Sequence, residues 1–264
     1  MNIIKRELKA HLKGMIIWCS VMILLIIVWM SEFSAYYDNP EMAEVLKSIP
    51  EAMLKAFSMH NANLTTVEGF ISLVMVFVYI IAGIHAVLLG SSIISKEERD
   101  KTAEFLFTLP VPRHKVILSK LAAALINCII LNAVINLTQY LGTLKYESGP
   151  DFGKFMWLII LGTFIIQLIF LSLGMLMAAI LRRYKKSGSV SLFILLGTYF
   201  LSVMLSFSDK IEFLKYTTPF KFFEPNSLLN DLKFEAVYII ISAVIITAGI
   251  TGTFIFYQKR DLHI

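Results

Sequence analysis

The chain has 264 residues, of which 57% are hydrophobic and only 16% are charged. Soluble domains are about half apolar and about a quarter charged, so this composition excludes an ordinary soluble protein and indicates an integral membrane protein. The formal net charge is +5, and both cysteines lie within apolar runs, so we expect no disulfide framework.

Six stretches are long and apolar enough to cross a bilayer as helices, which takes roughly 20 residues each. Basic residues precede the first, as in a signal peptide, but its apolar core is longer and no Ala-x-Ala cleavage site follows. We therefore predict an all-α integral membrane protein whose single transmembrane domain covers residues 1–264. The predicted spans are about 14–30, 69–94, 116–141, 155–181, 188–207 and 236–257.

The loop between the first two predicted spans is long and carries signals of two short helices. Asn39 can cap the first helix, and Pro40 suits its first turn. Ser48 can cap the second, because Glu51 follows three residues later, as in a capping box. We expect both helices on the outer face of the protein.

The second predicted span contains His85, the one ionisable residue that lies clearly at bilayer depth. Ionisable residues are rare inside membrane helices, so His85 is a candidate for a translocation pathway. An imidazole that hydrogen-bonds to a neighbouring helix would explain it equally well. Both interpretations stay open.

Residues 95–120 form the most charged run of the chain. Ser95 can cap a helix whose first turns are acidic, where the helix dipole favours acids. Apolar residues then repeat at a spacing of four, which predicts an amphipathic helix at about 96–109 that Pro110 and Pro112 end. Its polar side mixes acids and bases, which favours a protein partner over a lipid surface.

The third predicted span carries a row of amides. Asn132, Asn136 and Gln139 follow an i, i+4, i+7 spacing and therefore share one helix face. Amides are costly to leave unpaired in lipid, so this face should point at protein or at a water-filled path. Interhelical hydrogen bonds and a translocation pathway are both consistent with it, and Gln167 in the fourth span is a similar candidate.

The loop before the last span mixes aromatic residues with lysines. Such mixing suits the headgroup boundary of a membrane, where the rings sit half-buried. A packed cap over the outer ends of the helices is equally consistent. The aromatic residues are Phe213, Tyr216, Phe220, Phe222 and Phe223.

Basic residues are divided unevenly between the two sides of the predicted bundle. Of the 24 Lys and Arg residues, 16 fall on the side that the two termini, the second loop and the fourth loop share. Lys and Arg concentrate on the cytoplasmic side of membrane proteins, so both termini and the charged run are predicted to be cytoplasmic.

Several kinds of chemistry have no motif in this sequence. It holds no Gly-x-x-x-x-Gly-Lys-[Ser/Thr] phosphate loop, no Cys/His spacing typical of metal sites, and no His-Glu-x-x-His or Gly-x-Ser-x-Gly motif. We therefore expect no catalytic residue, no metal ligand, no directly bound cofactor and no nucleic-acid partner. The chain is not expected to hydrolyse ATP by itself.

The run EERDKTAEFLFTLPVPR resembles the cytoplasmic segment after the second span of type-2 ATP-binding-cassette (ABC) exporter permeases. Many of these read Thr-x-Glu-Phe-Leu-Leu and then Pro-x-x-Arg, although many have Gly where Lys101 stands, and Phe107 replaces a frequent Leu. TPFKFFEP, at 218–225, is similar to a loop before their last span. In that family the charged segment is the coupling helix that contacts the ATPase. The resemblance gives this docking role to Glu97, Glu98, Arg99, Asp100, Lys101, Thr102, Glu104, Phe105, Leu106, Pro110 and Arg113.

The resemblance also implies a multi-pass protein of the bacterial plasma membrane, in contact with membrane lipid. It would pair with a second copy or a related permease and with a cytoplasmic ABC ATPase that binds ATP and Mg²⁺. The candidate pathway (His85, Asn132, Asn136, Gln139 and Gln167) lacks a strip of acids or bases, which favours export of an amphipathic, peptide or hydrophobic cargo. The alternatives are a non-transporting peptide-immunity or sensor subunit and a membrane enzyme or energy-independent channel.

Overall fold

The computed structural model describes residues 3–50, 54, 63–100, 112–181, 184–207 and 209–259. Within these ranges every regular element is a helix, which confirms the predicted all-α fold. Six of these helices are long and apolar enough to cross a membrane, as predicted. They are α1 (Ile3–Phe33), α4 (Val67–Arg99), α6 (Arg113–Thr143), α7 (Phe152–Ile180), α8 (Tyr184–Leu205) and α11 (Ala236–Gln258).

Two of the long helices extend well beyond their apolar runs. α1 begins at Ile3, although the predicted span begins at Gly14, and α4 continues to Arg99, beyond the predicted end at Ile94. Both extensions add charged residues to an apolar helix. They lie at the same end of the molecule.

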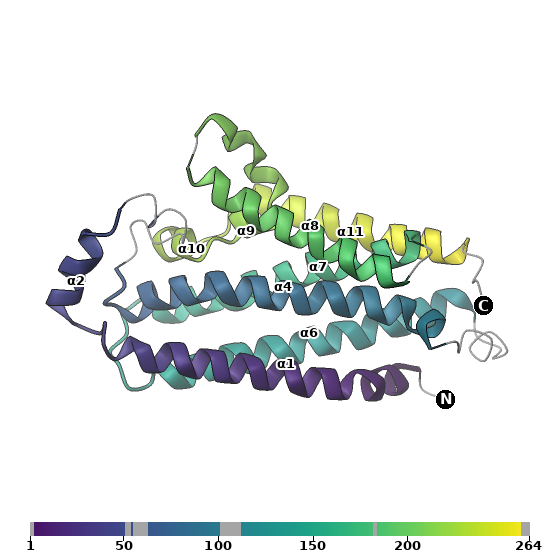
Figure 1. The fold of residues 1–264 in the computed structure, drawn as a ribbon, viewed down its shortest axis with the longest axis horizontal. Coiled ribbons are helices and arrows are strands. Elements are labelled where there is room, and N and C mark those ends of the chain that lie inside the picture. The colour runs from purple at the N-terminus through teal and green to yellow at the C-terminus, as the bar shows by residue number, and fades with distance from the viewer. Residues whose placement is uncertain are drawn as a thin grey trace.

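The long helices lie side by side along the long axis of the molecule (Figure 1). α1 begins and α11 ends at one end of this bundle, where α4 also ends and α6 begins. We call this the terminal end. The opposite end, the cap end, carries these short helices within the described residues: α2 (Pro40–Lys47), η1 (Asp209–Thr217), α9 (Pro219–Phe222) and α10 (Pro225–Asp231).

α4 packs directly against α7, and two glycines set the distance between their backbones. A Cβ atom added at Gly90 would lie 2.3 Å from the Leu171 carbonyl oxygen, and one added at Gly174 would lie 2.2 Å from the Val87 carbonyl oxygen. Neither distance leaves room for a side chain, so the two backbones touch. Small residues at helix crossings permit such contact in membranes.

The loop between the first two spans was predicted to hold two short helices, and the structure describes the first of them as α2. The Asn39 side-chain oxygen accepts a hydrogen bond from the Met42 amide at 3.2 Å, so the first predicted surface helix has its predicted cap. The second predicted helix falls on residues 51–62, of which the structure describes only Leu54.

The aromatic residues before the last span divide between the two predicted environments. Phe220, Phe222 and Phe223 are buried. Phe220 contacts rings of α7 and α8, and Phe222 contacts a ring of α11. Phe213 and Tyr216 are exposed. The loop is therefore a packed cap in its second half, while its first half keeps exposed rings, as expected of a headgroup boundary.

Candidate functional site

The charged residues after the second span continue α4 and do not start a new helix. Ser95, which was expected to cap a new helix, lies inside α4, where its hydroxyl donates a hydrogen bond to the Ser91 carbonyl at 2.7 Å. Such a bond to the preceding turn is compatible with an unbroken helix. Residues 96–99, at the start of the predicted coupling helix, therefore belong to α4. Its residues 101–109 lie outside the described ranges.

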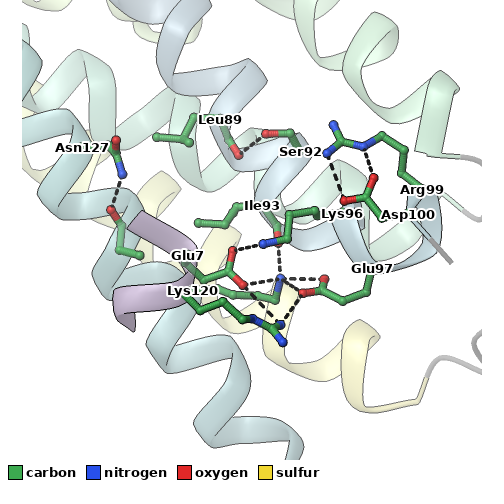
Figure 2. Close-up of polar contacts among 12 residues, drawn as sticks. Glu7, Leu89, Ser92, Ile93, Lys96, Glu97, Arg99, Asp100, Lys120 and Asn127 are labelled. Atoms are coloured by element: carbon green, nitrogen blue, oxygen red, sulfur yellow. Dashed lines mark hydrogen bonds and ion pairs between the residues drawn. The ribbon is translucent and has the colours of Figure 1, made fainter. Parts of the chain in front are cut away.

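Five charged side chains from three helices meet at the terminal end (Figure 2). Arg6 and Glu7 come from α1, Lys96 and Glu97 from α4, and Lys120 from α6. We call them the terminal charge cluster. The side chains of Glu7 and Lys120 are 0% exposed, and that of Glu97 is 2% exposed.

Lys120 lies at the centre of this cluster. Its ammonium nitrogen donates to the two carboxylate oxygens of Glu97, at 2.8 and 2.7 Å, and to the carbonyl of Ile93. These three acceptors match the three N–H donors of a lysine ammonium group. The start of α6 is thereby fixed against the last turns of α4.

Helix α1 joins the cluster through Glu7 and Arg6. Lys96 Nζ donates to Glu7 Oε2 at 2.9 Å. Arg6 Nη2 lies 3.4 Å from Glu97 Oε1 and 3.7 Å from Glu7 Oε1. Three cations therefore face two carboxylates, and the cluster carries a net charge of +1.

Glu97 does not match the role expected of it as an ATPase contact. Its carboxylate binds Lys120 inside the bundle, so it presents no surface to a partner. The physical reason is that α1 and α6 bring cations to it, which the local sequence around residue 97 does not reveal.

The chain becomes accessible two residues after Glu97. Arg99 and Asp100 are exposed, and Arg99 Nε donates to Asp100 Oδ1 at 2.9 Å. This hydrogen bond lowers the pKa of Asp100 below its ordinary value. Glu98 is half-buried. The docking role of these three residues stays a prediction.

The other residues of the predicted docking segment can be placed only in part. Arg113 is the first residue of α6, and its Nη1 donates to the Gln258 carbonyl at 3.0 Å, at the end of α11. Helix C-termini favour such cations. The remaining docking residues lie outside the described ranges: Lys101, Thr102, Glu104, Phe105, Leu106 and Pro110.

The amides of α6 lie on its buried face. Asn132 Nδ2 donates to the Ile160 carbonyl of α7 at 3.2 Å, and Asn136 Nδ2 donates to Asn132 Oδ1 at 2.6 Å. Gln139 and Gln167 are 0% exposed, and their amides have no hydrogen-bond partner within the described part of the chain. The Asn132 contact fits the packing interpretation, whereas the two glutamines are not explained by it.

His85 is buried and lines a cavity of about 290 Å³ between α1, α4, α6 and α8. Its ring meets Trp18 of α1 edge-on, with 5.4 Å between ring centroids. Its Nδ1 has no hydrogen-bond partner in the described ranges, so the expected hydrogen bond to a neighbouring helix is not seen at this atom. His11 and Asn127 line the same cavity.

Sequence reasoning missed Glu7 and Lys120 as a site. Lys120 lies both in the charged run 95–120 and inside the predicted third span, at 116–141. A charged residue within a span is expensive unless it has a partner, so its position was a usable signal. Glu7 was the single acid among the basic residues of the N-terminus.

Six helices that can span a membrane, with a buried charge cluster where three of them meet, define a multi-pass membrane protein. The chain belongs to the ABC-2 family transporter proteins, whose family model matches residues 1–262. This match confirms the resemblance to ABC-2 type permeases, and such permeases generally work with a partner ATPase. A search of curated protein sequences found no significant match.

Proposed function

We propose that this chain is the transmembrane permease subunit of an ATP-driven exporter. The observation that carries the proposal is the family match over residues 1–262. In this proposal the terminal end faces the cytoplasm, in keeping with the excess of Lys and Arg in the segments that share that end.

The ATPase would dock on the chain between α4 and α6. Arg99 and Asp100 are exposed at the entry to this stretch. Their mixed charges, and those of the residues that follow, suit a protein partner. ATP and Mg²⁺ would be bound by the ATPase, and a second permease copy or a related permease would complete the pathway.

The cargo we propose is amphipathic, peptide-like or hydrophobic. The amides of α6 provide polar groups inside the bundle, and within the described ranges the amides of Gln139 and Gln167 have no partner there. Among the described residues that line the cavity beside His85, none is acidic. These features favour a weakly polar cargo over a small cation.

Co-purification tests the proposal. The chain, carrying an affinity tag, is co-expressed with an ABC ATPase of the same organism, and the complex is isolated in lipid nanodiscs. We expect the ATPase to co-purify and Asp100→Lys to reduce its recovery several-fold, because the exposed carboxylate would meet a cation of the partner. The matched control is Asp231→Lys, an exposed acid at the cap end, which should leave recovery unchanged.

Two results would contradict the proposal. The first is equal recovery of the ATPase with and without the membrane chain. The second is a cellular phenotype of the chain that persists when the ATPase carries a substitution that blocks ATP hydrolysis. The second result would favour a peptide-immunity or sensor subunit.

A further inference from the structure

Three residues of the terminal charge cluster flank the chain that would dock the ATPase. Lys96 and Glu97 precede it, and Lys120 follows it. Glu97 is in the last turn of α4, and Lys120 is about two turns into α6. The chain from Asp100 to Pro112 thus begins shortly after Glu97 and ends shortly before Lys120, which are the two partners of one ion pair. A displacement of that connection would act on α4 and on α6, and this ion pair joins the two helices.

The cluster adds a third helix that is not adjacent in sequence to this connection. Glu7 accepts from Lys96 at 2.9 Å, and Arg6 lies 3.4 Å from Glu97. The first turns of α1 are therefore attached to the last turns of α4 by charge. This attachment lies in the part of α1 that precedes the apolar span.

Stability alone does not require charges at this place. Replacing a buried ion pair by well-packed apolar side chains is often neutral or stabilising, whereas removing one partner is strongly destabilising. What the ionic contacts supply is a fixed geometry, because Lys120 uses its three donors on Glu97 and the Ile93 carbonyl.

We infer that the terminal charge cluster joins α1, the end of α4 and the start of α6 into one unit that moves when the connection between α4 and α6 is displaced. Lys120 and Glu97 are its positioning residues. This inference rests on the proposed function, since it is the ATPase that would displace the connection. Through Glu7 and Arg6, α1 would move together with α4 and α6 when the ATPase displaces this connection.

A paired substitution separates positioning from stability. Lys120→Met leaves buried carboxylates without their main partner, so it should lower thermal stability. Lys120→Met combined with Glu97→Met removes the pair together, so stability should largely return. The link that Lys120 and Glu97 make between α4 and α6 should not return, while Lys96 and Glu7 still join α4 to α1. The matched control replaces the exposed pair Lys215 and Glu212 by methionine at the cap end.

Spin labels measure the link directly. They are attached at Lys9→Cys on α1 and Lys115→Cys on α6, both exposed, with Cys19→Ala and Cys128→Ala to remove the native thiols. Distances are recorded for the complex with the ATPase, without nucleotide and with ATP trapped by a hydrolysis-deficient ATPase. We expect one narrow, unchanged distribution with the native cluster, and a distribution that broadens or shifts with ATP in the double-methionine variant.

The possible outcomes distinguish this inference from the proposed function. If no ATPase binds the unaltered chain, the proposed function fails and the inference fails with it. If the ATPase binds, two results overturn the inference alone. One is that the double-methionine variant gives the native distribution in both nucleotide states. The other is that the α1–α6 distance changes with ATP while the cluster is intact.

Discussion

Lys120 is an ammonium group with no exposed surface, held by Glu97 and by the Ile93 carbonyl. A charge in this setting is tolerated because its partners replace the water that it has lost. Glu7 is also fully buried, and Lys96 compensates it at 2.9 Å. Each of these side chains therefore depends on a residue that is distant in sequence.

We predict that Lys120→Met alone lowers the free energy of unfolding by about 3–5 kcal/mol, because the buried Glu97 carboxylate loses its closest cation and keeps only Arg6, at 3.4 Å. Chemical unfolding in detergent micelles measures the change. Lys215→Met is the comparison, because the Lys215–Glu212 pair is exposed, and little change is expected there. Equal stability of the two variants would contradict the interpretation of Lys120 as a buried, paired cation.

The helix face of some buried polar residues could be predicted from the sequence, whereas the partners of the buried charged residues could not. Asn132, Asn136 and Gln139 could be placed on one face because helical spacing alone determines it. The pairing of Glu97 with Lys120 could not, because it joins two helices across a connection and no local pattern records it. The burial of Glu97 could not be predicted for the same reason.

At the scale of elements, the contact between α4 and α7 depends on Gly90 and Gly174. Each glycine lies under a carbonyl oxygen of the other helix, at a distance that leaves no room for a Cβ atom. This contact brings two backbones together in the middle of the bundle. α4 is also the helix that carries His85 and ends in the terminal charge cluster, so its placement affects both features.

We predict that Gly174→Ala destabilises the protein by about 1–3 kcal/mol, the usual cost of overpacking a close contact. Gly197→Ala in α8 is the matched control, because nothing lies within 4 Å of the added Cβ and alanine favours a helix. Thermal unfolding in micelles compares the two. A Gly174→Ala variant as stable as Gly197→Ala would show that α4 and α7 are not in backbone contact.

The six long helices were predictable because apolar length is recorded directly in the sequence. Their charged extensions were not. Residues 3–13 lie before the first predicted span, and residues 96–99 were expected to start a new helix, yet both are continuous with long helices. The ion pairs between the two extensions join residues that are distant in sequence, so no local pattern predicts them.

At the scale of the whole molecule, the bundle has two unlike ends. The terminal end combines the start of α1, the end of α11 and the terminal charge cluster, while the cap end carries short helices and packed aromatic residues. In the proposed exporter, the first end receives the motion of an ATPase and the second faces the exterior. The buried amides of α6 and the cavity beside His85 lie among the helices that join these ends.

The central claim is that an ABC ATPase docks at the terminal end, and site-specific photo-crosslinking tests it most directly. A photoreactive phenylalanine analogue replaces Asp100 or, in a separate variant, Asp231; both residues are exposed, and they lie at opposite ends of the bundle. With the co-expressed ATPase present, we predict a crosslink to the ATPase from position 100 and none from position 231. A crosslink from position 231, or from neither position in a complex that co-purifies, would contradict the account.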